Sequence, residues 1–445
     1  MMTKVADTID LYLSMFSALE RNPGRGAWLM PIRKAAISRF AELGFPTTDD
    51  EEWRFTNVAP IAEKAFEAAP EVVLSTGDLR SHLISTNGDG TRLVFVNGRF
   101  APALSVTKAL PKGLRVMHLR EAIEREDETA RTHLARHARC DGDGFTALNT
   151  ALFEDGPFIE IERGAVVEDP VHVIHVSVAG CMPWMASPRG LIVAGESSQC
   201  SVVESFIAPS AGVYFNNVAT EIVAMENATV DYYKLARESG AAYHISTLRL
   251  DQYRNSNVHA FVGTFGGGLV RNDIHTVLDG DGCDCGLNGL YMVDGEEHVD
   301  NHLIVEHAKP HCDSREFFKG ILDGRGKGIF SGRIIVRPDA QKTDAKQTNM
   351  SLLMSDDARV ESKPQLEIFA DDVKCTHGAT IGQINDEAIF YLRSRGLDEK
   401  AARGILIHAF AGEALDRVRV EPLRAIMEQL VAERLPRTAS LRKSA

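Results

Sequence analysis

Cysteine is scarce in this sequence: seven residues, odd in number and widely spaced, occur among 445. That usage excludes a disulfide scaffold and favours a reducing compartment. Clusters of lysine and arginine are also missing, and the formal net charge is −13. We therefore expect no nucleic-acid partner and no binding to an anionic membrane surface.

Long apolar runs are absent as well. No stretch approaches the roughly 18 uncharged apolar residues that a bilayer-spanning helix needs. The first 22 residues carry acids through their apolar stripe and have no small-residue cleavage pattern, which predicts an amphipathic helix rather than a signal peptide. We therefore expect a soluble, cytoplasmic protein. The motifs G-x-x-x-x-G-K-[ST], G-x-S-x-G and H-E-x-x-H are missing too, which argues against a nucleotide site of its own and against self-sufficient hydrolase machinery.

The first third, residues 1–140, reads as mostly helical. An apolar stripe ends at Asn22–Pro23–Gly24, and a second helix over 27–43 ends at Gly44, with Pro46 just beyond. A third helix is predicted over 119–138. Between them, RLVFVNGRF (92–100) alternates and carries Asn97–Gly98, which predicts a β-hairpin.

Residues 141–384 change character. Short β-branched runs follow polar corners rich in Gly, Asn, Asp and Ser, and these corners recur at intervals of roughly 25–45 residues. A sandwich and a solenoid both fit short, numerous strands. Most joints lack hairpin dipeptides, which favours a parallel β-helix. The fold class expected is mainly β, with helical regions on either side.

Residues 385–445 form the third predicted region. Asn385 and Asp398 are placed to cap two helices, Gly396 separates them, and Pro422 suits the first turn of a third helix. No flexible linker separates these helices from the β region. The last ten residues are polar and basic and are expected to fray.

The stretch DDVKCTHGATIG (371–382) places Cys375 and His377 two residues apart after a β-like run. In an extended segment such residues share a face, so a thiolate and an imidazole could together bind a metal or receive sulfur. Two ligands do not complete a site. The alternative is a small buried Cys and a hydrogen-bonded His at a strand end, which spacing alone favours. Leu366 and Ile368 have the opposite parity to Cys375, which predicts a corner or bulge near 370–372, or a face turned to a partner.

Other polar clusters have simpler interpretations. Cys283 and Cys285 lie in a Gly/Asp-rich corner that lacks the closing glutamate of a calcium loop and the second Cys pair of a zinc finger. Four histidines at 298, 302, 307 and 311 would suit metal only in a helix, whereas the alternating pattern predicts a strand and scattered, partly exposed side chains. The stripe Gln341, Thr343, Gln347 and Asn349 could bind a polar ligand, but a hydrogen-bond ladder along stacked turns is favoured.

Long segments of the chain resemble the SufB/SufD family of iron–sulfur cluster assembly proteins. They are SGRIIVRPDAQKTDAKQTNMSLLMS, KPQLEIFADDVKCTHGATIGQINDEAIFYLRSRG and AARGILIHAFAGEAL in the last third, GFPTTDDEEWRFTNVAPI near the start, and NGLYMVDGEEHVDNHLIVEHAKPHCDSREFFKG in the middle. Within the family, Gly378 after the motif histidine is similar to the SufD form, because SufB-type chains typically carry a glutamate there.

The resemblance implies a right-handed parallel β-helix between helical regions and a non-enzymatic scaffold role. It implies a complex with a SufB-type paralogue and a SufC-type ATPase, the latter docked on helices at 385–435, with sulfur arriving from a cysteine desulfurase system. A homodimer is expected when the chain is alone. His377, with Cys375 as auxiliary thiol, would contribute to a nascent cluster at the SufB–SufD interface. The roles of Cys283 and Cys285 stay open.

Two other functions remain open from the sequence. One is a β-helix enzyme acting on polysaccharide, which needs a carboxylate or basic constellation along a groove. The other is a purely structural solenoid whose Cys and His are inert.

Overall fold

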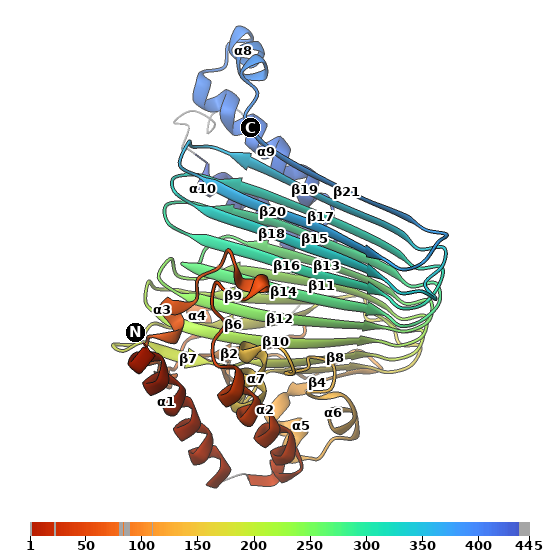
Figure 1. Ribbon diagram of the computed structural model, residues 1–445. Helices are drawn as coiled ribbons and strands as arrows, with labels where there is room; N and C mark the ends of the chain where they lie inside the picture. Colours follow the sequence, from red (N-terminus) through yellow and green to blue (C-terminus); the bar gives the residue numbers. More distant parts are fainter. Residues whose placement is uncertain (1, 22–23, 80–82, 84–89, 109, 436–445) are drawn as a thin grey trace.

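The computed structural model describes residues 2–21, 24–79, 83, 90–108 and 110–435. The predicted stop at 22–23 and the predicted frayed tail at 436–445 lie outside these residues. At the centre is a parallel β-solenoid of about eight turns, with helices at both ends of the chain (Figure 1). The predicted fold class, a parallel β-helix core with flanking helices, is confirmed. No helix in the described part of the chain is both long and apolar enough to cross a membrane.

The solenoid has two sheets, and from β8 onward consecutive strands alternate between them. The first sheet is ordered β20-β18-β16-β14-β12-β10-β8-β5-β4, with β7 and β1 attached beside β10. Its strands are β1 (Glu67–Ala68), β4 (Leu114–His118), β5 (Pro157–Ile161), β7 (Trp184–Ala186), β8 (Arg189–Ala194), β10 (Tyr214–Ala224), β12 (Tyr243–Gln252), β14 (Leu269–Leu278), β16 (His298–His307), β18 (Lys327–Val336) and β20 (Arg359–Ile368).

The second sheet is ordered β21-β19-β17-β15-β13-β11-β9-β6-β2-β3. Its strands are β2 (Arg92–Val96), β3 (Arg99–Phe100), β6 (Val171–Val176), β9 (Gln199–Ile207), β11 (Thr229–Arg237), β13 (Asn257–Thr264), β15 (Asp284–Val293), β17 (Asp313–Leu322), β19 (Asp344–Leu353) and β21 (Lys374–Gln383). The β2–β3 pair is the antiparallel hairpin that Asn97–Gly98 predicted.

Register is regular along the solenoid. Paired residues are 26 apart at Tyr243 and Leu269 and 32 apart at Lys327 and Arg359, within the range that the recurring corners predicted. Because the pairing is parallel and in register, equivalent side chains stack in columns, one turn above another, and each column faces either the interior or the surface. The interior is filled mainly by aliphatic side chains such as Ile222, Leu250, Leu303 and Ile334.

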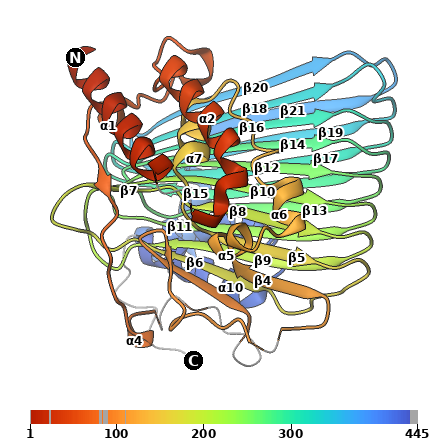
Figure 2. The same ribbon diagram turned by 90° about the horizontal axis from the view of Figure 1, so that it is seen from below.

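Helices cover the outer faces of the two sheets. The helices before the solenoid are α1 (Met2–Arg21), α2 (Met30–Leu43), α3 (Ala59–Ala62), α4 (Thr76–Leu79), α5 (Leu119–Glu124), α6 (Glu128–His133) and α7 (Gly144–Leu152), with 3-10 turns at Gly24–Leu29 and Glu51–Trp53. Those after it are α8 (Asp386–Ser394), α9 (Glu399–Leu415) and α10 (Glu421–Arg434). Aromatic residues from α1, α2 and α7 pack on Phe215 of the first sheet, whereas α9 and α10 pack on Tyr233 and Phe317 of the second (Figure 2).

Most predicted helix boundaries are confirmed. Gly44, at φ +63°, ends α2 and donates its N–H to Phe40, and the side chains of Asn385 and Asp398 cap α8 and α9. The predicted helix over 119–138 is wrong. It divides into α5 and α6 because Glu126 takes a left-handed conformation, φ 54°, and Asp127 then caps a new helix by accepting from two backbone N–H groups.

Candidate functional site at the end of the solenoid

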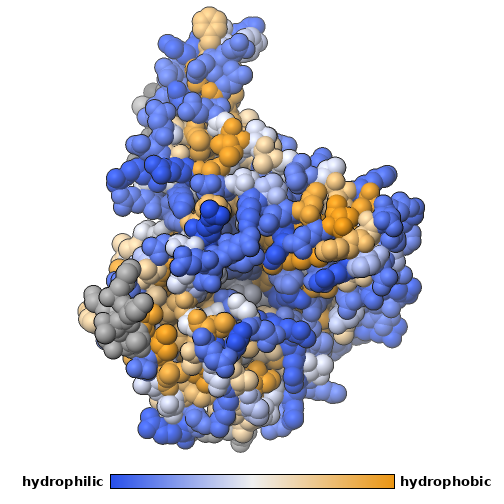
Figure 3. Space-filling model, in the orientation of Figure 1, coloured by the Kyte–Doolittle hydropathy of each residue, from blue (hydrophilic) through white to orange (hydrophobic). Residues whose placement is uncertain are grey.

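The two ends of the solenoid differ. At the N-terminal end, the antiparallel strands β3 and β4 finish the two sheets. At the C-terminal end the last strands, β20 and β21, are each ten residues long, and within the described residues each pairs on one side alone. Exposed Ile368, Phe369 and Ile381 lie there, and Figure 3 shows apolar surface over this last turn. Long, unprotected edge strands with apolar side chains are a template for pairing with another chain.

The chain turns a corner between β20 and β21, where Ala370 is buried. Leu366 before the corner and Val373 and Cys375 after it all pack against the interior cluster. The conflict of parity that the sequence showed is therefore resolved by the predicted corner, which lets both segments face inward.

Cys375 and His377 lie on β21, two residues apart. They are the register partners of Ala345 and Gln347, whose side chains face the interior one turn below. Cys375 is half-buried, and burial raises the pKa of its thiol. His377 is exposed, and its ring makes no hydrogen bond with the described residues. The pair thus faces the open end of the solenoid with a thiol and an imidazole.

The pair is not a complete metal site. In the part of the chain that the structure describes, no group of three or more His, Cys, Asp or Glu side chains is arranged to hold a metal ion. Cys375 and His377 therefore offer two of the ligands that a soft or borderline metal needs.

Sequence reasoning missed a buried carboxyl beneath this pair. Glu316 on β17 is the register partner of Gln347, and the Gln347 Nε2 donates to Glu316 Oε2 at 2.7 Å. Burial raises the pKa of Glu316 to about 8, so the side chain is neutral at pH 7. The Gln347–Glu316 bond is one step of the predicted ladder along stacked turns, whereas Asn349 bonds across the interior to Ser362 on β20.

Other thiols lie inside the solenoid. The interior cluster buries Cys283 at the Gly/Asp-rich corner, Cys285 on β15 and Cys312 just before β17. A hydrogen bond from the Cys312 thiol lowers the pKa of Cys283 to about 7, while burial raises the pKa of Cys285. The neighbour of Cys283 is thus Cys312 of the next turn, a pairing that C-x-C spacing does not reveal.

The four histidines fall on strand β16 and the corner after it, as the alternation predicted. Their expected partial exposure holds for His298 and His311 but is wrong for His302 and His307, which are buried. His302 donates to Glu52 at 2.6 Å, and His307 bonds the hydroxyl of Ser314 at 2.9 Å. Glu52 is far from His302 in the sequence, and Ser314 lies on β17, beyond the corner that follows His307. The alternation along β16 could therefore not indicate either contact.

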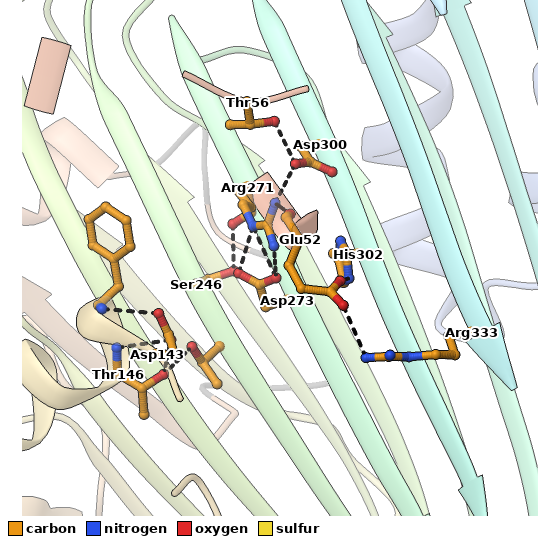
Figure 4. Close-up of polar contacts among 12 residues, drawn as sticks. Glu52, Thr56, Asp143, Thr146, Ser246, Arg271, Asp273, Asp300, His302 and Arg333 are labelled. Atoms are coloured by element: carbon orange, nitrogen blue, oxygen red, sulfur yellow. Dashed lines mark hydrogen bonds and ion pairs between the residues drawn. The ribbon is translucent and has the colours of Figure 1, made fainter. Parts of the chain in front are cut away.

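A charged cleft of about 430 Å³ lies where residues 51–56, here called the N-terminal clamp, cross the first sheet. Figure 4 shows Glu52 between His302 and Arg333, and Thr56 beside Asp300. The Arg271 guanidinium stacks 3.7 Å from the Trp53 ring centre. These contacts join the clamp to β14, β16 and β18, more than 200 residues later in the chain.

We expect the clamp to weaken in acid. The hydrogen bond from His302 lowers the pKa of Glu52 to about 2, below its ordinary value of 4.5. A depressed carboxyl pKa contributes stability that is fully present above about pH 4.5 and is lost as pH falls toward 2. The difference in unfolding temperature between the wild type and Glu52→Gln should therefore shrink over that window.

The neighbouring variant Glu51→Gln is the matched control. Glu51 pairs with Lys363 at 2.8 Å, but its side chain is 72% exposed. Such a surface pair contributes little. A Glu52→Gln difference that did not change between pH 4.5 and 2 would contradict the role of Glu52 as an ionised clamp residue.

The family model for the SUF system FeS cluster assembly, SufBD core domain, matches residues 178–410, and that for the SufBD protein N-terminal region matches residues 2–173. An iron–sulfur cluster assembly SufBD family protein of Synechocystis is 33% identical over 409 residues, 90% of each chain. The iron–sulfur cluster assembly protein SufD of Escherichia coli is 32% identical over 414 residues, 91% of this chain and 93% of that protein.

Proposed function

This chain belongs to the SufBD family of iron–sulfur cluster assembly proteins, and from that premise we propose that it is a non-enzymatic scaffold subunit. It forms a complex with a SufB-type paralogue and a SufC-type ATPase, and a cysteine desulfurase system supplies sulfur indirectly. In this proposal residues 1–140 brace the solenoid, residues 141–384 carry the assembly site, and residues 385–445 hold the ATPase.

The observation that carries the proposal is the open end of the solenoid. Cys375 and His377 face it, and β20 and β21 offer unpaired edges and apolar side chains beside them. A partner that pairs with these strands would bring its own ligands next to the thiol and imidazole. We therefore treat the pair as half of a site that the SufB-type paralogue completes.

The cargo of this site is a nascent cluster, held transiently. A neutral imidazole and a thiolate are both suitable iron ligands. Because burial raises the pKa of Cys375, its thiol is protonated at neutral pH, and binding iron would release that proton. His377 needs no such step when its ring is neutral, which supports His377 as the leading ligand and Cys375 as the auxiliary one.

The ATPase is proposed to dock on the helices at 385–435. Helix α8 projects from the solenoid (Figure 1) and exposes Phe390 and Tyr391, with Ile405 of α9 nearby in sequence. Helices α9 and α10, in contrast, bury Ile407, Leu423 and Met427 against the second sheet. Movement of the bound ATPases could then reach the solenoid through a packed element, as a two-state rearrangement requires.

Two matched variants distinguish the proposed ATPase surface on α8 from the proposed paralogue surface at the open end of the solenoid. Phe390→Asp places a charge on α8, and Phe369→Asp places one at the open end; the two phenylalanines are 74% and 58% exposed. We expect Phe390→Asp to lose the ATPase while keeping the scaffold paralogue, and Phe369→Asp to do the reverse, as measured by co-purification. Loss of both partners in either variant, or of neither in both, would contradict the assignment of the two surfaces.

Co-expression tests the function itself. The chain is produced with a SufB-type paralogue and a SufC-type ATPase, and the purified assembly is supplied with iron, cysteine and a desulfurase. We expect a ternary complex that acquires clusters, read from visible absorption and from iron and sulfide content. No complex, or a chain that alone cleaves polysaccharide, would overturn the proposal in favour of the enzyme or the inert solenoid.

A further inference from the structure

A column of interior side chains leads directly to His377. Glu316 on β17, Gln347 on β19 and His377 on β21 are register partners in successive turns. Neighbouring parallel strands lie about 4.8 Å apart, so each side chain in such a column is within reach of the next. The column joins an exposed imidazole to two polar groups that are almost completely buried, at 2% exposure for Glu316 and 1% for Gln347.

One end of the Gln347 amide is fixed. Its Nε2 donates to Glu316 Oε2 at 2.7 Å. Gly332 of β18 approaches the same amide from the facing sheet, and a Cβ at position 332 would collide with Nε2. A carboxyl accepts this bond in either protonation state, so the amide keeps its orientation whether or not Glu316 is ionised.

The other end of the amide has no partner. Gln347 Oε1 is buried and accepts no hydrogen bond from the described residues. A buried acceptor without a donor is unfavourable, because it has lost its hydrogen bonds to water and gained none. One turn above it, the ring of His377 also makes no hydrogen bond within the described chain. An unpaired acceptor and an unpaired donor thus occupy adjacent places in one column.

We propose that Gln347 is a positioning residue for the cluster-assembly site, and that its Oε1 accepts the N–H of the His377 imidazole when the site is assembled. The bond fixes the tautomer and direction of the ring and leaves the other ring nitrogen free to bind iron. Histidines that bind metals generally donate their second nitrogen to such an acceptor. This inference rests on the proposed function, because it gives His377 the role of an iron ligand.

The test uses the full ternary complex and three substitutions at position 347. Gln347→Met keeps the length of the side chain but removes the acceptor, and Gln347→Glu keeps an acceptor oxygen. Loss of such a supporting group lowers metal affinity by about 10–100-fold. We therefore expect Gln347→Met to lower cluster content at limiting iron by about tenfold, and Gln347→Glu to restore it to within about twofold of wild type. If Gln347→Met prevents assembly of the complex, Gln347→Asn replaces it, since an amide shortened by one methylene cannot reach both Glu316 and His377.

Controls distinguish this inference from the function on which it rests. Glu316→Gln should be silent, because a neutral amide oxygen can accept the same bond from Gln347. His377→Ala reports on the proposed function. If His377→Ala loses clusters while the acceptor-lacking variant at 347 matches wild type, the role of Gln347 is wrong and the function stands. If His377→Ala itself matches wild type, the function fails. Equal losses in Gln347→Met and Gln347→Glu, with the complex intact, would overturn the acceptor role.

Discussion

Replacing His377 with alanine is expected to lower the cluster content of the assembled complex by about tenfold or more, the scale on which even a supporting residue of a metal site acts. The side chain is exposed at the open end of the solenoid and makes no hydrogen bond within the described residues, so its removal should not disturb folding. The measurement is iron and acid-labile sulfide per complex after assembly, alongside the stoichiometry of the three subunits.

Thr376→Ala is the matched control, because Thr376 is exposed on the same strand and points to the opposite face. It should assemble clusters as the wild type does. Cys375→Ser should cost less than His377→Ala if the thiol is auxiliary. Normal cluster content in His377→Ala, in a complex of intact composition, would show that this histidine is not a ligand.

Glu221→Ala is expected to cause the largest loss of stability. Glu221 is fully buried on β10, and its carboxylate accepts from three backbone N–H groups, those of Ala135, His137 and Ala138, at 2.8–2.9 Å. It also pairs with the fully buried Arg189 guanidinium at 2.8 Å. Removing one partner of a buried ion pair costs about 3–5 kcal/mol, because the other charge is left uncompensated.

The loss should be measured as a fall in the unfolding midpoint of the chain in urea and on heating. The substitution also leaves three N–H groups without their acceptor, so the loop over 134–138 should exchange its amide hydrogens faster. Glu226→Ala, five residues further along the chain, is the control. Its ion pair with Arg254 is on the surface and should contribute little. A Glu221→Ala protein as stable as that control would contradict the structural role of the pair.

The solenoid was predictable because its signal is repeated. Each turn contributes a polar corner and an alternating strand, so errors in single elements do not change the architecture, and caps such as Asn385 and Asp398 are local. The prediction of one continuous helix over 119–138 was wrong for a reason that is also local. Charges spaced along a helix face cannot indicate that Glu126 will adopt a positive φ and that Asp127 will begin a new helix.

Only part of the candidate site could be predicted from the sequence. Parity on β21 places Cys375 and His377 on one face, and the corner after Phe369 explains how that face reaches the interior. The residues beneath them depend on register between turns: Gln347 is 30 residues before His377, and Glu316 is 31 before Gln347. Those offsets vary with corner length, so no fixed spacing identifies the column before the strands are paired.

The most direct test of the half-site is a cross-link from Cys375 to the scaffold paralogue. The purified complex is treated with a short bis-maleimide, which joins two cysteine thiols by addition, after the exposed Cys181 has been changed to serine. We predict a cross-linked species of this chain and the paralogue that disappears in Cys375→Ser and in Phe369→Asp. A complex in which Cys375 reacts freely with a monofunctional thiol reagent and forms no cross-link would contradict the claim that the partner closes this end of the solenoid.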